Sequence, residues 1–176
     1  MAVLGRRKGL PNARRLLDPP SALQQIGVWC WMQTNLDVML APATAELKAR
    51  AGSVSQLRVL DIGCGTGETC AIWLDGGAHV TGVDVSAPML ARAAERTQGK
   101  VRLLEADASQ WVSDTPFDLV VSRFGAMFFA APDQAFATIS ANVRPGGRLL
   151  FTCWRQHGLT SLAGRAWRGC PLMLGH

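Results

Sequence analysis

The chain has 176 residues, of which 48% are hydrophobic and only 18% are charged, and its formal net charge is +5. A chain of this length fits a single domain and buries enough surface to fold without disulfides or a metal. The composition excludes a highly charged disordered chain, a collagen and a long coiled coil.

The positive charge lies at the two ends of the chain and not in its body. Residues 1–17 include five basic and no acidic residues, and residues 154–176 include three basic and no acidic residues. Residues 18–153 include ten basic and 13 acidic residues, which gives this segment a charge of −3. Because the basic residues form no stripe on a predicted element, we expect no specific nucleic-acid partner.

The cysteines and histidines indicate a cellular compartment and a site without metal. Five cysteines form no C-x-x-C pair, and their odd number indicates a reducing compartment. We therefore expect a cytoplasmic protein, while the arginine-rich, acid-poor N-terminus leaves a mitochondrial presequence as the alternative. The three histidines have no metal-ligand spacing, so no metal is expected. The longest apolar run, 124–131, is too short to span a bilayer, so no membrane partner is expected.

Changes in composition along the chain predict one domain between two tails. Residues 1–20 are expected to form a basic flexible tail, and residues 155–176 an irregular basic tail. The domain between them, 21–154, is predicted to consist of N-terminal helices over 21–52 and a ligand-binding core over 57–154.

Two helices are predicted at the start of the domain. Ser21 is a suitable N-cap for a helix that runs toward Leu40 and that Pro42 ends. A second, short helix is predicted over Ala43–Arg50, and Gly52 ends it.

From residue 57 onward, short runs rich in Val, Leu and Ile alternate with helix-like segments. The predicted strands are Leu57–Ile62, His79–Val85, Val101–Ala106, Phe117–Ser122 and Arg148–Cys153. The predicted helices are Glu68–Leu74, Ala87–Arg96 and Gln134–Val143, and a short turn is predicted around Gln110. Arg144-Pro145-Gly146-Gly147 is predicted to end the last helix and to turn into the fifth strand. This alternation predicts an α/β fold with a Rossmann-like, doubly wound, mostly parallel sheet.

Ligand-binding side chains are expected beyond the carboxyl ends of these strands. The first strand ends in Asp61-Ile62-Gly63-Cys64-Gly65-Thr66-Gly67, where the glycines let the backbone approach a ligand. Asp84 ends the second strand at a spacing that suits the hydroxyls of a ribose. Asp107, after the third strand, has the chemistry to accept a hydrogen bond from an exocyclic amine. Together these groups predict one elongated ligand that crosses three strand ends.

Five collinear motifs over residues 57–154 carry a resemblance to a known family. They read VLDIGCGTG, GVDVSAPML, EADASQW, FDLVVSRFGAMFF and NVRPGGRLLFTCW. With these motifs the segment resembles a class I S-adenosylmethionine-dependent methyltransferase of the small-molecule type. The resemblance implies S-adenosyl-L-methionine as cofactor and methyl transfer to a small organic acceptor by in-line displacement.

The resemblance also implies positions for the cofactor-binding residues. The methionine part would lie along the glycine turn, the ribose hydroxyls at the second strand end, the adenine beside the next two segments, and the methyl group after the fourth strand. In that order the implied residues are Asp61, Gly63, Cys64, Gly65 and Gly67, then Asp84, then Val85, Met89, Asp107 and Ala108, and finally Ser122 and Arg123.

A nicotinamide-dependent dehydrogenase is the competing interpretation, because its fold is related. Its G-x-G-x-x-G fingerprint does not match, since the third glycine, Gly67, comes one position early. Glu68 at the following helix start would also repel a pyrophosphate.

The acceptor side of the predicted site leaves two interpretations open. Residues after the fourth strand, among them Phe124, Met127 and Phe128, are either a buried patch under the next helix or the wall of an apolar acceptor pocket. No convincing general base is present, and His157 fits a surface position better than a catalytic one.

The end of the chain departs from the family pattern. Only residues 154–176 follow the fifth strand, which is too few for the helix and antiparallel β-hairpin that the family usually adds. We therefore expect a sheet that lacks this hairpin. This expectation leaves a second functional class open, a shortened, non-catalytic cofactor-binding or interaction protein.

Overall fold

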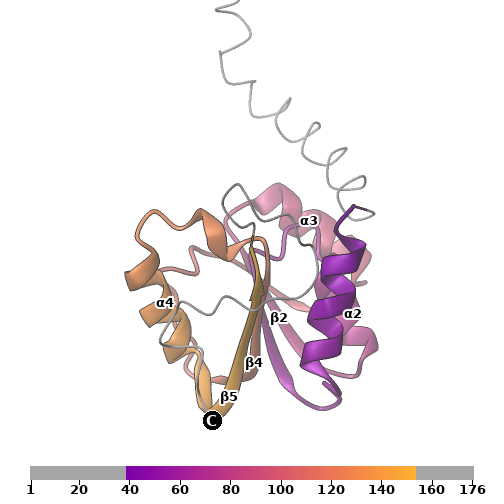
Figure 1. Ribbon diagram of the computed structural model, residues 1–176. Helices are drawn as coiled ribbons and strands as arrows, with labels where there is room; N and C mark the ends of the chain where they lie inside the picture. Colours follow the sequence, from indigo (N-terminus) through magenta and orange to yellow (C-terminus); the bar gives the residue numbers. More distant parts are fainter. Residues whose placement is uncertain (1–38, 154–176) are drawn as a thin grey trace, which may run out of the picture.

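The computed structural model describes residues 39–153 of the chain (Figure 1). The predicted tails over 1–20 and 155–176 and the predicted helix from Ser21 lie outside the described residues. The described part contains one parallel sheet with helices on both faces. This architecture confirms the predicted α/β fold.

The first described element is a helix that runs from residue 39 to residue 51 without interruption. The prediction that Pro42 separates two helices is therefore wrong. A proline removes the hydrogen bond that its own nitrogen would donate, and the turn of helix at Pro42 forms despite this loss. Across this turn, Thr44 Oγ1 donates to the carbonyl oxygen of Leu40 at 3.1 Å, which adds a bond beside the missing one.

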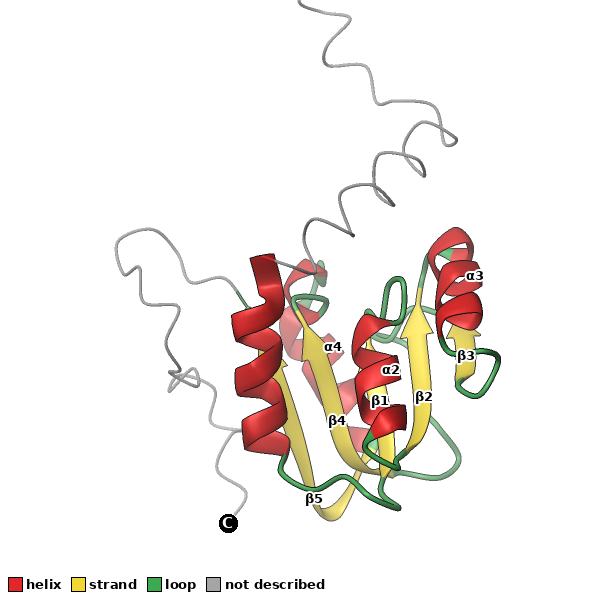
Figure 2. Cartoon of the chain, turned by 90° about the vertical axis from the view of Figure 1, so that its right-hand side faces the viewer, coloured by secondary structure: helices red, strands yellow, loops and turns green. Residues whose placement is uncertain are grey.

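Five parallel strands form the sheet in the order β3-β2-β1-β4-β5 (Figure 2). Their bounds are Arg58–Ile62 for β1, His79–Asp84 for β2, Arg102–Glu105 for β3, Phe117–Arg123 for β4 and Val143–Thr152 for β5. The chain moves outward from β1 to β3 and then returns to add β4 on the other side of β1. At such a reversal the loops beyond the strand ends separate, which creates room for a ligand.

Helices cover the two faces of the sheet, and each face has its own apolar cluster. Helix 39–51, α2 (Glu68–Asp75) and α3 (Ala87–Arg96) pack on one face, where Trp73 is 2% exposed. The 3-10 helix η2 (Ala126–Phe128) and α4 (Pro132–Ala141) follow β4, and Ile139 of α4 packs on the other face. Figure 1 shows α4 on the opposite side of the sheet from helix 39–51. Because both faces are covered, the central strands carry fully buried apolar runs, such as residues 119–121 in β4.

The fifth strand begins five residues earlier than predicted, at Val143. The prediction that residues 144–147 form only a turn is wrong, because these residues lie inside β5 as an irregularity. Phe117 pairs with Val143, whereas Leu119 pairs with Arg148, so five steps on β5 face two steps on β4. Such a bulge lets a strand continue past residues that do not fit its pairing.

Two groups of side-chain hydrogen bonds lie at the end of the sheet opposite the carboxyl ends of the strands. Asp118 accepts hydrogen bonds from the amide of Arg58 at 2.7 Å and from Arg144 Nε at 2.5 Å, and these bonds hold its pKa below the ordinary value. Arg148 of β5 donates from Nη1 and Nη2 to the carbonyls of Arg50 and Ala51, at 3.2 and 2.7 Å. The second group satisfies terminal carbonyls of helix 39–51 and ties this helix to the sheet.

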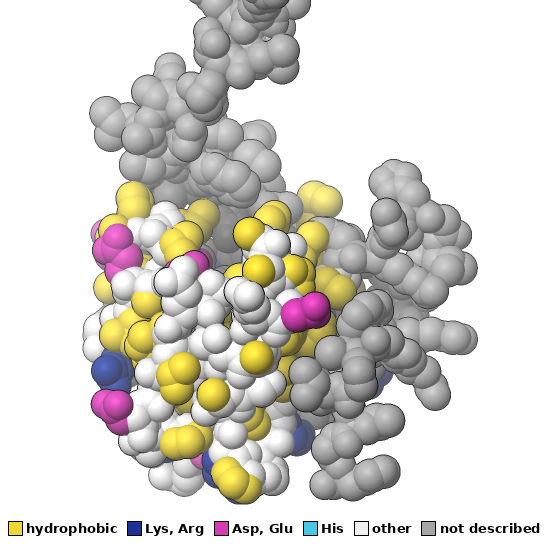
Figure 3. Space-filling view, turned by 90° about the vertical axis from the view of Figure 1, so that its left-hand side faces the viewer, with side chains coloured by type: hydrophobic (Ala, Val, Ile, Leu, Met, Phe, Trp, Pro, Cys, Tyr) yellow, Lys and Arg dark blue, Asp and Glu magenta, His cyan; other side chains and the backbone are white. Residues whose placement is uncertain are grey.

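The surface and the helices give two further facts about the described part of the chain. Figure 3 shows the α4 side of the molecule, where hydrophobic side chains are scattered among uncharged ones and the basic side chains occur as isolated spots. No helix within residues 39–153 has the length and apolar character needed to cross a membrane.

Candidate cofactor and acceptor site

A pocket of about 1340 Å³ opens beyond the carboxyl ends of the strands. Its walls come from the loops after β1, β2, β3 and β4 and from Leu40 of helix 39–51. Nine of the twelve residues that the resemblance assigned to the cofactor line this pocket: Gly63, Cys64, Gly65, Asp84, Val85, Met89, Asp107, Ala108 and Arg123. The fold therefore brings together residues from four separate motifs.

The glycine turn after β1 forms the floor of the pocket and is held by tight backbone contacts. The amides of Gly63 and Cys64 both donate to the carbonyl of Val83, at 2.8 and 3.1 Å. Gly63 has a φ of +65°, and a Cβ at this position would lie 2.8 Å from the Cα of Gly125. A side chain is therefore excluded on two grounds, backbone conformation and space. The turn after β1 and the loop after β4 are in direct backbone contact.

Asp84 connects the glycine turn to the beginning of α3. Its Oδ2 accepts from the amide of Gly65 at 2.8 Å, and its Oδ1 accepts from the amide of Ser86 at 2.9 Å. The carboxylate lies on the pocket wall, and each of its oxygens keeps a second lone pair for a ligand. This arrangement suits a pair of neighbouring hydroxyl groups.

Asp107 and its neighbours form the wall after β3. The Oδ1 of Asp107 accepts from the amide of Ser109 at 2.8 Å, and Gln110 Nε2 donates to its Oδ2 at 3.3 Å. The hydrogen bonds from Ser109 lower the pKa of this carboxyl from its ordinary value, so it is ionised at neutral pH. Asp107 is thus a fixed acceptor beside the buried Ala108.

Three of the twelve residues do not line the pocket and have partners inside the fold instead. Asp61 is fully buried behind the pocket-lining Thr69, whose Oγ1 donates to Asp61 Oδ2 at 2.5 Å. The amide of Gly67 donates to the carbonyl of Cys64 at 2.9 Å. Ser122 Oγ donates to the carbonyl of Ile62 at 2.8 Å and accepts from the amide of Ala126 at 2.9 Å. These groups support the residues that face the pocket.

The electrostatics of Asp61 follow from its burial. Desolvation raises its pKa from 3.8 to about 6, while hydrogen bonds from Thr69 and Cys70 act in the opposite direction. Within the described part of the chain, its Oδ1 has no hydrogen-bond partner. The negative charge of this carboxylate thus lies just beneath the glycine turn.

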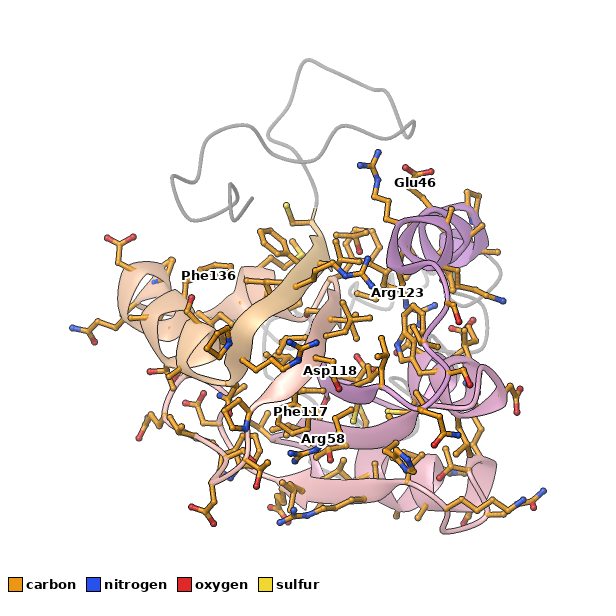
Figure 4. All side chains as sticks on the ribbon, turned by 90° about the horizontal axis from the view of Figure 1, so that it is seen from below. Glu46, Arg58, Phe117, Asp118, Arg123 and Phe136 are labelled. Atoms are coloured by element: carbon orange, nitrogen blue, oxygen red, sulfur yellow. The ribbon has the colours of Figure 1, made fainter. Side chains whose placement is uncertain are left out.

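Arg123 connects three elements around the pocket. It ends β4, its Nη1 forms an ion pair with Glu68 Oε2 at the start of α2, and it donates to Thr44 Oγ1 at 2.9 Å. Figure 4 shows its side chain extending from the sheet toward the N-terminal helix that carries Glu46. The side chain of Arg123 is only 9% exposed. These contacts tie helix 39–51 to the end of β4 and to the start of α2.

The loop after β4 forms an apolar wall opposite the acidic one. Phe124 begins it with a φ of +62°, a conformation that bulky residues rarely adopt and that is found at functional sites. The apolar residues that line the pocket on this side are Leu40, Phe124, Met127, Phe128, Phe129, Ala130, Ala131 and Ala135. Sequence reasoning had left Phe124, Met127 and Phe128 open between a buried patch and a pocket wall, and the geometry places them at the pocket.

Several pocket residues were not predicted, and the sequence carried little signal for them. Leu40 lies in the helix that was expected to end there, and Gln134 is near the start of α4. Thr69 lies two positions after the glycine turn, in the first turn of α2, and helical geometry turns it toward the pocket. Of these residues, only Thr69 had a position in the sequence that indicated a place at the pocket.

Among residues 39–153, no group of three or more His, Cys, Asp or Glu side chains could hold a metal ion.

Known proteins with similar sequences and structures are methyltransferases. The family described as "Methyltransferase domain" matches residues 60–151. The malonyl-[acyl-carrier protein] O-methyltransferase of Pseudescherichia vulneris is 36% identical over 123 residues, which cover 69% of this chain and 48% of that protein. The demethylmenaquinone methyltransferase of Thermus thermophilus is 37% identical over 99 residues, which cover 53% of this chain and 45% of that protein.

A solved structure adds a ligand to this comparison. The S-adenosylmethionine-dependent methyltransferase of Thiobacillus denitrificans, in complex with S-adenosyl-L-homocysteine, is 28% identical. The match has a TM-score of 0.53 and covers 64% of this chain and 46% of that one. The chain spans about half the length of the curated relatives it matches. Because these relatives are named as methyltransferases, they give no support to the non-catalytic alternative.

Proposed function

Because the chain belongs to the methyltransferase domain family, we propose that it transfers the methyl group of S-adenosylmethionine to a small organic acceptor. The observation that carries this proposal is the Asp84 carboxylate. It lies on the pocket wall and accepts a hydrogen bond from the amide of Gly65. The Asp84 carboxylate and the glycine turn therefore line the same part of the pocket. An acid at this position, beside a glycine turn, suits the hydroxyls of a ribose.

The residues of the pocket fit this cofactor better than a nicotinamide dinucleotide. Acidic side chains gather on the cofactor side, where Asp84, Glu105 and Asp107 line the pocket and Asp61 lies beneath the glycine turn. These charges attract a ligand with an ammonium and a sulfonium group, and they repel a pyrophosphate. The close contact between Gly63 and Gly125 gives the turn a fixed backbone surface on which the methionine part of the cofactor would lie.

Each part of the pocket then has a role in positioning. Asp84 would hold the ribose hydroxyls, Val85 and Met89 would contact the adenine, and Asp107 would accept from its amino group. When bound, S-adenosylmethionine supplies a methyl group that its sulfonium already activates. The protein therefore contributes mainly by holding the acceptor in line and excluding water, and such positioning supplies about 7–11 kcal/mol of a barrier. Arg123 would support this geometry through its contacts with Glu68 and Thr44.

The acceptor is proposed to be a small molecule and the protein to act in the cytoplasm. The two curated relatives above are named for malonyl-[acyl-carrier protein] and for demethylmenaquinone, which are acceptors of different kinds. The described cysteines Cys64, Cys70 and Cys153 are all free, which supports a reducing compartment.

Replacement of Asp84 tests the assignment of the cofactor. Asp84→Ala should weaken binding of S-adenosyl-L-homocysteine by more than about tenfold, because the ribose hydroxyls lose a charged acceptor. Isothermal titration calorimetry measures this change, and thermal unfolding shows whether the variant is folded. The control is Asp114→Ala, the same substitution at an exposed position outside the pocket. Equal affinities for the folded Asp84 variant and the control would refute the assignment.

A further inference from the structure

The mouth of the pocket has an apolar rim. The large hydrophobic side chains that stay exposed in the described chain are Met39, Val85, Val112, Met127 and Phe128. Val85, Met127 and Phe128 line the pocket, and Phe128 is 79% exposed. Exposed apolar side chains that gather at one place mark a binding surface. We call Leu40, Met127 and Phe128 the apolar rim, because the proposed adenine contact of Val85 belongs to the cofactor.

The pocket is larger than one ligand needs. Pockets of roughly 300–1,000 Å³ hold a drug-sized ligand, whereas this one has about 1340 Å³. The charges of the lining are also separated, since the pocket-lining acids Asp84, Glu105 and Asp107 lie at or just after the ends of β2 and β3. The lining after β4 is apolar apart from Arg123, which is paired with Glu68, and Gln134. The volume beyond the cofactor side therefore suits an uncharged, apolar molecule.

Backbone contacts fix the apolar wall beside the glycine turn. Gly125 packs so closely that an added Cβ would lie 2.8 Å from the carbonyl oxygen of Ile62 and 2.9 Å from the Cα of Gly63. The amide of the preceding residue, Phe124, donates to the carbonyl of Thr152 at 3.0 Å. These contacts hold Phe124 in its left-handed conformation. The wall is thus preformed at the place where a methyl acceptor must meet the cofactor.

We infer that the methyl acceptor has an apolar body, an alkyl chain or an uncharged ring, that binds between the cofactor and the apolar rim. Its nucleophilic atom points inward to the methyl group, and its apolar body extends outward past Met127 to Phe128. The inference rests on the proposed function and adds the acceptor class to it. Continuity of the rim with the cofactor pocket favours the acceptor as occupant over a second copy of the chain.

A series of 1-alkanols from hexanol to nonanol, with S-adenosyl-L-homocysteine at saturation, serves as the probe. Affinity should rise about threefold to fourfold with each added methylene, because each one is removed from water at the rim. The double variant Met127→Ser/Phe128→Ser should bind nonanol at least tenfold more weakly than the wild type. The control Val112→Ser, which removes another exposed apolar side chain, should leave nonanol affinity unchanged. Ligand-observed NMR measures these affinities.

The cofactor titration separates failure of this inference from failure of the proposed function. The inference is overturned if S-adenosyl-L-homocysteine binds but nonanol does not, or if the control loses as much affinity as the rim variant. It is also overturned if sedimentation velocity shows a wild-type dimer that the rim substitutions dissociate, since a second copy would then occupy the rim. If S-adenosyl-L-homocysteine itself does not bind to the folded protein, the proposed function fails first.

Discussion

Asp61 combines full burial with a negative charge at the end of the central strand β1. Its partners, Thr69 Oγ1 at 2.5 Å and Cys70 Sγ at 3.4 Å, both donate to Oδ2. Burial nevertheless dominates and raises the pKa of the carboxyl to about 6. The folded protein therefore pays a desolvation cost at neutral pH to keep this charge beneath the glycine turn.

This raised pKa predicts a pH dependence of stability with a defined sign. The pKa of Asp61 in the folded state, about 6, is above its ordinary value of 3.8, so the folded state binds this proton more tightly. Proton binding at Asp61 therefore stabilises the folded state. This stabilisation is fully present below pH 3.8 and is lost as the pH rises through 6. Relative to Asp61→Asn, the wild-type free energy of unfolding should rise by about 2 kcal/mol from pH 7 to pH 4.5.

Urea unfolding of both proteins at several pH values measures this difference. The comparison removes the opposite contributions of Asp107 and Asp118, whose lowered pKa values destabilise both proteins equally in acid. A difference that stays constant between pH 7 and pH 4.5 would show that Asp61 has an ordinary pKa.

The sequence predicted which residues gather at the site better than it predicted how each one faces. Asp84 and Asp107 were expected at strand ends and line the pocket. Asp61 and Ser122 also lie near strand ends, but their side chains point into the fold. For Asp61 and Asp84 the difference is one of height along the sheet. Asp61 pairs with Gly82, so Asp84 lies two residues farther along its strand and reaches the edge of the sheet, whereas Asp61 stays inside it.

At the scale of elements, the contact between the glycine turn and the loop after β4 holds the two halves of the pocket together. Gly125 should tolerate no side chain here, although its own φ of about −78° is ordinary. Gly125→Ala should lower the free energy of unfolding by about 1–3 kcal/mol, because the new Cβ overpacks the contact with Gly63 and Ile62. The same displacement should weaken S-adenosyl-L-homocysteine binding on the order of tenfold.

Calorimetry and urea unfolding of two glycine variants test this contact. The matched control is Gly99→Ala, where a Cβ meets nothing within 4 Å and only the positive φ is unfavourable. The Gly99→Ala variant should lose some stability but should keep the wild-type affinity for S-adenosyl-L-homocysteine. Wild-type affinity in Gly125→Ala would mean that the contact does not shape the pocket.

All five strands and the helices between them were predictable, because continuous apolar runs alternate with helical patterns. The errors lie at proline, at glycine and at one helix end, since the helix predicted over Gln134–Val143 ends at Ala141 and Val143 already belongs to β5. Pro42 was expected to end a helix, yet helix 39–51 continues through it because tertiary contacts such as those of Arg148 stabilise the helix. The Pro145-Gly146-Gly147 segment was expected as a turn, yet pairing with β4 on both sides makes it a bulge within β5.

The whole molecule separates its charges in a way that composition alone hides. The two sequence ends carry charges of +5 and +3, while residues 18–153 carry −3, which leaves the net charge of +5. Within that acidic body, Asp84, Glu105 and Asp107 lie on one side of the pocket and the apolar rim on the other. The pocket therefore has one side suited to a cationic nucleoside and one suited to an apolar acceptor. The sequence predicted the acids at the second and third strand ends. It left the role of Phe124, Met127 and Phe128 open, because that role depends on where the loop after β4 folds.

A calorimetric titration of the full chain with S-adenosylmethionine tests the central claim most directly. We expect saturable binding at one site per chain, and no displacement of the bound cofactor by millimolar NADH, since the acids around the glycine turn repel a pyrophosphate. Absence of binding to the folded protein at millimolar S-adenosylmethionine, or competition by NADH for the same site, would contradict the account.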